Sequence, residues 1–382
     1  MLTVDGRLAF AQPGDVVPDT ERPGVLRART RSLSSEAFDV HTCSIADWSK
    51  AEDFQPDLAR HGFDVADLSM FEDLQGTLRQ VYEAAHITDS DADELRRAFE
   101  GATLQLSSGT AVQVQYVAPD GLIMRKGGPN GLDVSAAPMS TRNDHDAAIS
   151  IHADQDVLGT PLRQVMDGRA PELFRHQAPD SQNDDGGLWL LNLWIPLHQI
   201  TRPLVLADGA SIDRPRHQLR YGLPVEGFLD REEDQRVNDI WSFLHHADQS
   251  WYFNAEMGAS SAYVFDTLST AHGSFMVPGE DVAEQAYLVL HAAESAIEGG
   301  DVAGLTQLLH DAQDLVVPSN STSALTLAIS EMLRLLDEAR QDPAGVAGAK
   351  AEPWCLAAKQ ARRSVVRMSV EMRVVASPVG DG

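Results

Sequence analysis

The sequence predicts a mainly β protein with substantial α structure, built on a double-stranded β-helix, or jelly roll. Three observations lead to this fold class. Short strand patterns alternate with long, turn-rich connections between residues 106 and 280. Residues 280–340 then show the spacing of Leu, Ala and Val that is typical of helices. A strand of period two returns at 362–376, so the helices are expected to interrupt the barrel.

The chain is accordingly expected to have three parts. Residues 1–105 form an N-terminal region that packs on the barrel, irregular up to about residue 70 and helical from Met70 to Phe99. Residues 106–280 and 359–382 form the jelly-roll core. Residues 281–358 form a helical insertion, in which 341–353 is expected to be a flexible connector.

Within the core, four segments have the pattern of strands. Residues 110–131 alternate around an Asp-Gly turn signal, which predicts a hairpin. Residues 147–154 and 261–275 each predict a strand. The segment 187–197 is apolar on both faces and is therefore expected to be buried.

Composition limits the possible partners. A net charge of −27 disfavours binding to nucleic acid and to anionic membranes, because like charges repel. The chain has no apolar run of about 18 residues and no signal-peptide pattern, and its two cysteines suit a reducing cytoplasm. We therefore expect a cytoplasmic protein that acts on a small molecule; its oligomeric state stays open, with a homodimer as one option.

The stretch "SIHADQD" (150–156) contains the strongest candidate for a metal site. His152 and Asp154 are two residues apart at the end of a strand, so their side chains share a face. His272 begins "HGSF" after the apolar strand "AYVFDTLST" and can reach them through strand pairing. Two histidines and one carboxylate form the facial triad of non-haem iron(II), which leaves positions for a chelating cosubstrate and oxygen.

The late strand offers a carboxylate site. Arg367 and Ser369 lie on one face of "RMSVEMR", where a guanidinium and a hydroxyl can bind one carboxylate. Arg363 and Arg373 compete for this role, and the choice between Arg367 and Arg363 stays open. Asn192, on the buried strand, needs hydrogen-bond partners, and a bound cosubstrate is one possibility.

These motifs together resemble the iron(II)/2-oxoglutarate-dependent dioxygenase superfamily, and most of all its phytanoyl-CoA hydroxylase-like branch. "NLWIPL", "VFDTLSTAHGSF" and "RMSVEMR" carry the resemblance, which spans roughly 110–275 and 362–376. It implies Fe(II), 2-oxoglutarate and O2, with Arg367 and Ser369 on the far carboxylate of 2-oxoglutarate. Because Asp154 is present, it also implies hydroxylation or another oxidation rather than halogenation. In that superfamily the arginine that binds the cosubstrate usually follows the distal histidine by a short distance. Here no arginine occurs between His272 and Arg334, so the resemblance requires that this arginine follow the helical insertion.

The expected function is therefore oxidation of a small polar metabolite or natural-product intermediate, with decarboxylation of 2-oxoglutarate to succinate. Arg163, Arg125 and Arg220 are candidates for contact with the substrate, and no catalytic residue is expected beyond the metal site. The alternative is a cupin-like metal-dependent isomerase or lyase, or a metal-binding protein without oxygenase activity. That alternative keeps the three metal ligands but gives Arg367 no special role.

Overall fold

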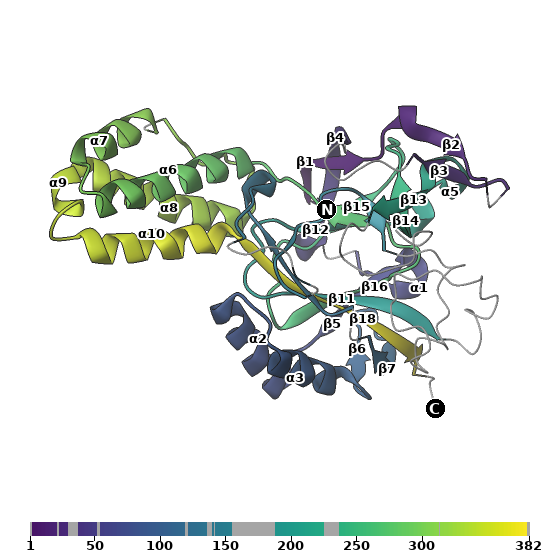
Figure 1. The fold of residues 1–382 in the computed structure, drawn as a ribbon. Coiled ribbons are helices and arrows are strands. Elements are labelled where there is room, and N and C mark those ends of the chain that lie inside the picture. Colours follow the sequence, from purple (N-terminus) through teal and green to yellow (C-terminus); the bar gives the residue numbers. More distant parts are fainter. Residues whose placement is uncertain are drawn as a thin grey trace.

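The computed structural model has a mixed α+β fold in which two β-sheets curl towards each other into a nearly closed barrel (Figure 1). The predicted jelly-roll fold class is confirmed. The structure describes residues 2–20, 23–29, 37–51, 54–118, 121–135, 140, 142–154, 188–224, 237–312 and 314–379. None of the helices in these ranges is long and apolar enough to cross a membrane.

The larger sheet has ten strands among the described residues. In spatial order they are β1 (Leu2–Phe10), β4 (Asp39–Asp47), β15 (Trp251–Phe253), β12 (Leu204–Ala207), β17 (His272–Ser274), β10 (His152–Ala153), β14 (Val237–Phe243), β13 (Gln218–Pro224), β3 (Leu26–Ala28) and β2 (Val16–Pro18). The expected single strand at 261–275 is two elements, because residues 267–271 form a turn between β16 and β17.

The second sheet contains β5 (Phe63–Asp67), β16 (Ser261–Asp266), β11 (Trp189–Pro196), β18 (Arg367–Pro378), β7 (Ala111–Val117) and β6 (Thr103–Gln105). In addition, β8 (Ile123–Gly127) pairs with β18, and β9 (His145–Asp146) pairs with β8. The hairpin expected over 110–131 is wrong. β7 and β8 do not pair with each other; both pair antiparallel with β18, one after the other along its length.

The N-terminal region is more ordered than expected. β1 and β4 pair antiparallel along their full lengths, from Leu2 opposite Asp47 to Phe10 opposite Asp39. The expectation of irregular structure up to about residue 70 is therefore wrong for the described part. These strands gain their stability from pairing with each other and with β15, which is distant in sequence, and local periodicity does not reveal such pairing.

The helices fall into two main groups, apart from α1 (Leu58–His61) and α5 (Arg214–His217). The expected helical stretch at Met70–Phe99 is confirmed as α2 (Glu72–Ala84) and α3 (Asp89–Phe99). Further along the chain lie α6 (Glu280–Glu298), α7 (Val302–Asp311), α8 (Ser323–Gln341), α9 (Pro343–Val346) and α10 (Ala351–Val365). The connector expected to be flexible at 341–353 is mostly helical, and the last strand begins at Arg367 rather than 362.

Side chains alternate between the faces of each sheet and so divide the core. On β18, Met368, Val370 and Met372 face outward and pack in the hydrophobic cluster that contains α2 and α3. Outward residues of the ten-stranded sheet, such as Val205 and Phe253, belong to a cluster that continues into α6, α8 and α10. Figure 1 shows these helices gathered at one side, with α10 leading directly into β18. The remaining faces line the barrel interior and carry the candidate site.

Candidate active site

His152 and His272 lie directly opposite each other on the paired strands β10 and β17, inside the barrel. Asp154 follows β10 closely. Its Oδ1 lies 3.3 Å from His152 Nε2, and its Oδ2 lies 3.8 Å from His272 Nε2. One possible ligand atom from each of these three buried residues lies within 4.8 Å of the others. Among the described residues, no other group of His, Cys, Asp and Glu has this geometry.

The second nitrogen of each imidazole is held by a backbone carbonyl. His152 Nδ1 lies 2.7 Å from the Ser150 carbonyl, and His272 Nδ1 lies 2.9 Å from the Thr270 carbonyl. An Nδ1–H donated to a carbonyl leaves the Nε2 lone pair free for a metal. Burial, with His152 nearby, lowers the pKa of His272 to about 4, so its imidazole is neutral at neutral pH. The donor set therefore fits a divalent metal such as iron(II).

Asp154 is held by two residues from the facing sheet. Asn192 on β11 donates to Asp154 Oδ2, and Arg373 Nη2 on β18 lies 3.4 Å from Oδ1. Burial opposes ionisation, but Arg373 and the two histidines together lower the pKa of Asp154 well below its ordinary value. The carboxylate is therefore ionised and oriented before a metal binds.

The polar face of β18 points into the barrel instead of towards solvent. Arg367 and Ser369 are almost completely buried, at 2% and 0% exposure. Arg367 Nε and Nη1, Ser369 Oγ and the nearby Trp194 Nε1 have no hydrogen-bond partner in the described structure. Burial, with Arg202 nearby, lowers the pKa of Arg367 to about 9, which still leaves it protonated at neutral pH. Buried donors without acceptors fit a bound carboxylate.

Arg363, the open alternative to Arg367, lies elsewhere. It is in α10, where its Nη2 donates to the carbonyls of Tyr82 and Glu83 and its guanidinium covers the Tyr82 ring. Arg363 is not on the strand at all, because α10 continues to Val365.

Asn192 also has partners other than a cosubstrate. Besides donating to Asp154, its Oδ1 accepts a hydrogen bond from Thr267 Oγ1 at 3.0 Å. Both ends of the amide are therefore engaged, and Asn192 lies beside the candidate ligand Asp154.

The three arginines predicted to contact substrate have different surroundings. Arg125 is at the site, opposite Ser369, but its Nε donates to Glu371 Oε1 at 2.8 Å. Arg220 is not brought to the site: it stands opposite Trp241 on the outer face and forms a buried ion pair with Asp19 at 3.1 Å. Arg163 lies outside the described residues.

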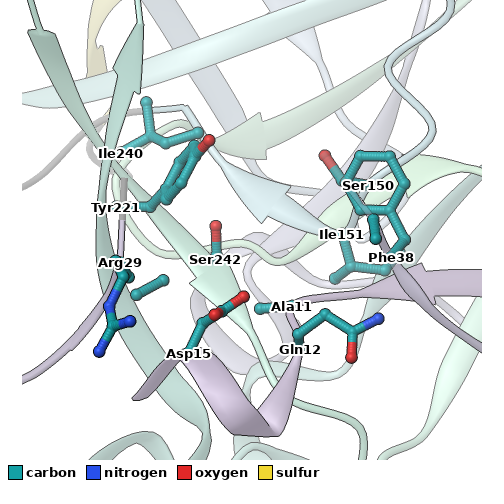
Figure 2. A pocket seen from close by; sticks show the side chains of 12 residues that line it. Ala11, Gln12, Asp15, Arg29, Phe38, Ser150, Ile151, Tyr221, Ile240 and Ser242 are labelled. Carbon is teal, nitrogen blue, oxygen red and sulfur yellow. The ribbon is translucent and has the colours of Figure 1, made fainter. Parts of the chain in front are cut away.

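A small cavity of about 70 Å³ lies beside His152. Ser150 and Ile151, the two residues before His152, line it, and so does Ser242, the strand partner of His152. In Figure 2, Tyr221 and Ile240 stand on one side and Ser150, Ile151 and Phe38 on the other. The N-terminal segments therefore contribute to the wall of this cavity, together with β13 and β14.

Sequence reasoning missed several residues of the site. Glu371 was not singled out, and Arg373 was considered only as a competitor of Arg367. Trp194 and Arg202 gave no signal, since a tryptophan in an apolar strand and a single arginine after it have ordinary explanations. Only the folded chain shows that their side chains are buried beside Arg367.

Comparison with solved structures finds chains that share this fold along nearly their whole length. A solved structure described as the iron and alpha-ketoglutarate-dependent endoperoxidase NvfI with different conformation matches with a TM-score of 0.50 and 13% identity, over 99% of this chain and 98% of that chain. Another structure of the same endoperoxidase has a TM-score of 0.47 and 12% identity, over 98% of each chain.

At such identities the likeness shows the fold alone. The resemblance read from the sequence is thus confirmed at the level of the fold, and its phytanoyl-CoA hydroxylase-like branch stays a prediction. No protein-family model matches the chain, and no curated protein matches it.

Proposed function

We propose that the protein is an iron(II)- and 2-oxoglutarate-dependent oxygenase that hydroxylates, or otherwise oxidises, a small polar metabolite or natural-product intermediate. The observation that carries this proposal is the pairing of two half-sites in one barrel. His152, Asp154 and His272 offer a metal site, and Arg367 with Ser369 offers buried, unpartnered donors on the facing sheet. The alternative, a metal-dependent isomerase or lyase, gives Arg367 no special role.

Each residue has a defined task in this proposal. His152, Asp154 and His272 would hold iron(II), which supplies the activation of O2 coupled to the decarboxylation of 2-oxoglutarate. Arg373 and Asn192 orient the Asp154 carboxylate. Arg367 and Ser369 bind the far carboxylate of 2-oxoglutarate and so fix the direction in which it approaches the metal.

The cavity beside His152 is our candidate for the substrate pocket. Its wall combines apolar side chains, such as Ile240 and Phe38, with the hydroxyl groups of Ser242 and Tyr221. Arg29 lies at its rim and is exposed, so it is better placed than Arg220 to meet a negatively charged substrate group. Arg163 stays a prediction.

The test is spectroscopic and needs no substrate. Iron(II) and 2-oxoglutarate are added without oxygen to the purified protein, and the visible charge-transfer absorption of an iron-bound 2-oxo acid is recorded. We expect the band in the wild type, its loss in Asp154→Ala and its weakening in Arg367→Ala at the same 2-oxoglutarate concentration. Arg216→Ala is the control, because the Arg216 side chain is 80% exposed.

The two candidate functions give different results. A band that requires 2-oxoglutarate and both residues supports the oxygenase. Metal binding without such a band would favour the isomerase, lyase or simple metal-binding alternative and would overturn the proposal.

A further inference from the structure

Arg202 is a buried arginine that the proposed function does not yet use. It follows β11 in the chain and is only 1% exposed. Its Nη1 donates to the Gly128 carbonyl at 2.7 Å, and its Nε lies 3.8 Å from Glu280 Oε2. Its Nε and Nη2 have no hydrogen-bond partner among the described residues. A buried guanidinium whose donors have no acceptor destabilises the folded protein, and a bound ligand that accepts their hydrogen bonds removes this penalty.

Arg202 and Arg367 flank the same point of the backbone. A Cβ built on Gly127 would lie 3.8 Å from Arg367 Nε and 3.9 Å from Arg202 Cδ. Arg202 is also the nearby charge that most strongly disfavours the protonated form of Arg367. Two guanidiniums held this close repel each other, so an anion beside both of them would be stabilising.

The charges around Arg367 favour a singly charged anion. Arg202, Arg125, Glu371 and Glu280 are the charged side chains that act on it most strongly. With Arg367 they make three positive and two negative charges, which leaves one positive charge over. A group with a single negative charge, such as a carboxylate, neutralises this cluster, whereas a phosphate dianion would leave it with a net negative charge.

Glu280 connects this cluster to the helical insertion. It is the first residue of α6 and is almost completely buried. It accepts hydrogen bonds from the backbone N–H groups of Asn130, at 2.6 Å, and Val277, at 3.0 Å. Glu280 is therefore fixed in place, and it can hold Arg202 while partly neutralising its charge.

We infer that Arg202 is a second arginine of the carboxylate pocket, held by Glu280 at the start of α6, and that both Arg202 and Arg367 donate to the far carboxylate of 2-oxoglutarate. The inference rests on the proposed function and deepens it. It gives the start of α6 a role in cosubstrate binding. It also gives a ligand to the Arg202 donors that have no hydrogen-bond partner among the described residues.

The test compares two 2-oxo acids by calorimetry on protein loaded with Mn(II). 2-Oxoglutarate has the second carboxylate, and 2-oxopentanoate has a methyl group in its place. In Arg202→Gln we expect the affinity for 2-oxoglutarate to fall about 10- to 100-fold, the range for losing hydrogen bonds to a charged group. The affinity for 2-oxopentanoate should change less than about threefold, because that ligand has nothing to offer Arg202.

Three further variants keep the test decisive. Arg202→Lys retains the charge beside Glu280 but loses the forked donors. It should therefore fold, but its preference for 2-oxoglutarate over 2-oxopentanoate should be smaller than in the wild type. Glu280→Gln should lower the 2-oxoglutarate affinity by a smaller factor than Arg202→Gln. Arg216→Gln, at an exposed position, should change nothing.

The outcomes separate the inference from the proposed function. If the wild type binds both acids equally, or neither, the proposed 2-oxoglutarate site itself is wrong. If the wild type prefers 2-oxoglutarate and both Arg202 variants keep the full preference, the second arginine is wrong and Arg367 acts without it.

Discussion

Asp154 is oriented by neighbours that do not themselves bind the metal in our proposal. Asn192 donates to its Oδ2, and Thr267 holds the other end of the Asn192 amide. In Asn192→Ala the three ligands remain, but the carboxylate loses one of the groups that fix it. We expect the affinity for Mn(II), measured by calorimetry, to fall about 10- to 100-fold, as is usual for residues that orient metal ligands.

Two comparisons make this prediction specific. Asp154→Ala should lower the metal affinity further than Asn192→Ala, because it removes a ligand. Asn254→Ala, in which a partly buried asparagine outside the site is changed, should leave it unaltered. An Asn192→Ala protein that binds Mn(II) as tightly as the wild type would show that Arg373 alone orients Asp154.

The Ser369 hydroxyl is expected to lower the stability of the free protein and to raise its affinity for 2-oxoglutarate. Its Oγ is buried without a partner, which destabilises the protein without cosubstrate. We expect Ser369→Ala to raise the free energy of unfolding by about 1 kcal/mol in the absence of ligand, and to weaken 2-oxoglutarate binding about fivefold. Urea denaturation and calorimetry measure the two effects. A variant that is less stable and binds normally would mean that Ser369 serves only packing.

At the scale of elements, the connection between β7 and β8 must pass very close to β18. A Cβ on Gly121 would lie 2.7 Å from Arg373 Cβ and 3.1 Å from its backbone nitrogen. Gly121→Ala should therefore displace the strand that carries Arg373, lowering the free energy of unfolding by about 1–3 kcal/mol. Because Arg373 contacts Asp154, Mn(II) affinity should fall as well.

Gly76→Ala is the matched control for Gly121→Ala. Gly76 lies within α2, and nothing stands within 4 Å of the added methyl group. That substitution should stabilise the protein by about 0.5–1 kcal/mol, since alanine is the better helix former. Equal effects of the two substitutions on denaturation would rule out the close approach at Arg373.

Elements with a clear internal pattern could be predicted from the sequence. The alternation in "RMSVEMR" predicted β18 and the shared face of Arg367 and Ser369, because strand geometry needs only local spacing. The apolar run at 187–197 predicted β11, and helical spacing predicted α2 and α3. The strand ends at His152 and His272 likewise brought the candidate triad together through antiparallel pairing.

Elements that depend on distant partners could not be predicted. β1 and β4 pair across about 30 intervening residues, and β7 and β8 share the partner β18 more than 200 residues away. The buried environment of Arg202 depends on Gly128 and Glu280, which belong to two other parts of the chain. A single sequence contains no local signal for such contacts.

At the scale of the whole molecule, the insertion and the barrel form one structural unit. The hydrophobic cluster on the outer face of the ten-stranded sheet continues into α6, α8 and α10. Arg362 on α10 makes two hydrogen bonds of 2.8 Å to Glu294 on α6, and α10 ends two residues before Arg367. The helices therefore support the strand that carries the proposed carboxylate site.

This continuity predicts that cosubstrate binding stabilises the insertion. A ligand that binds only the folded state raises the free energy of global unfolding, so every amide that exchanges through global unfolding gains protection. With Mn(II) and 2-oxoglutarate, we expect hydrogen exchange to slow in the buried turns of α6 and α8 as much as in β11 and β18. The exposed turn residues Ser319 and Asn320 should exchange at an unchanged rate. Slower exchange confined to the strands would show that the insertion unfolds on its own, and that Glu280 is too loosely coupled to the site to hold Arg202.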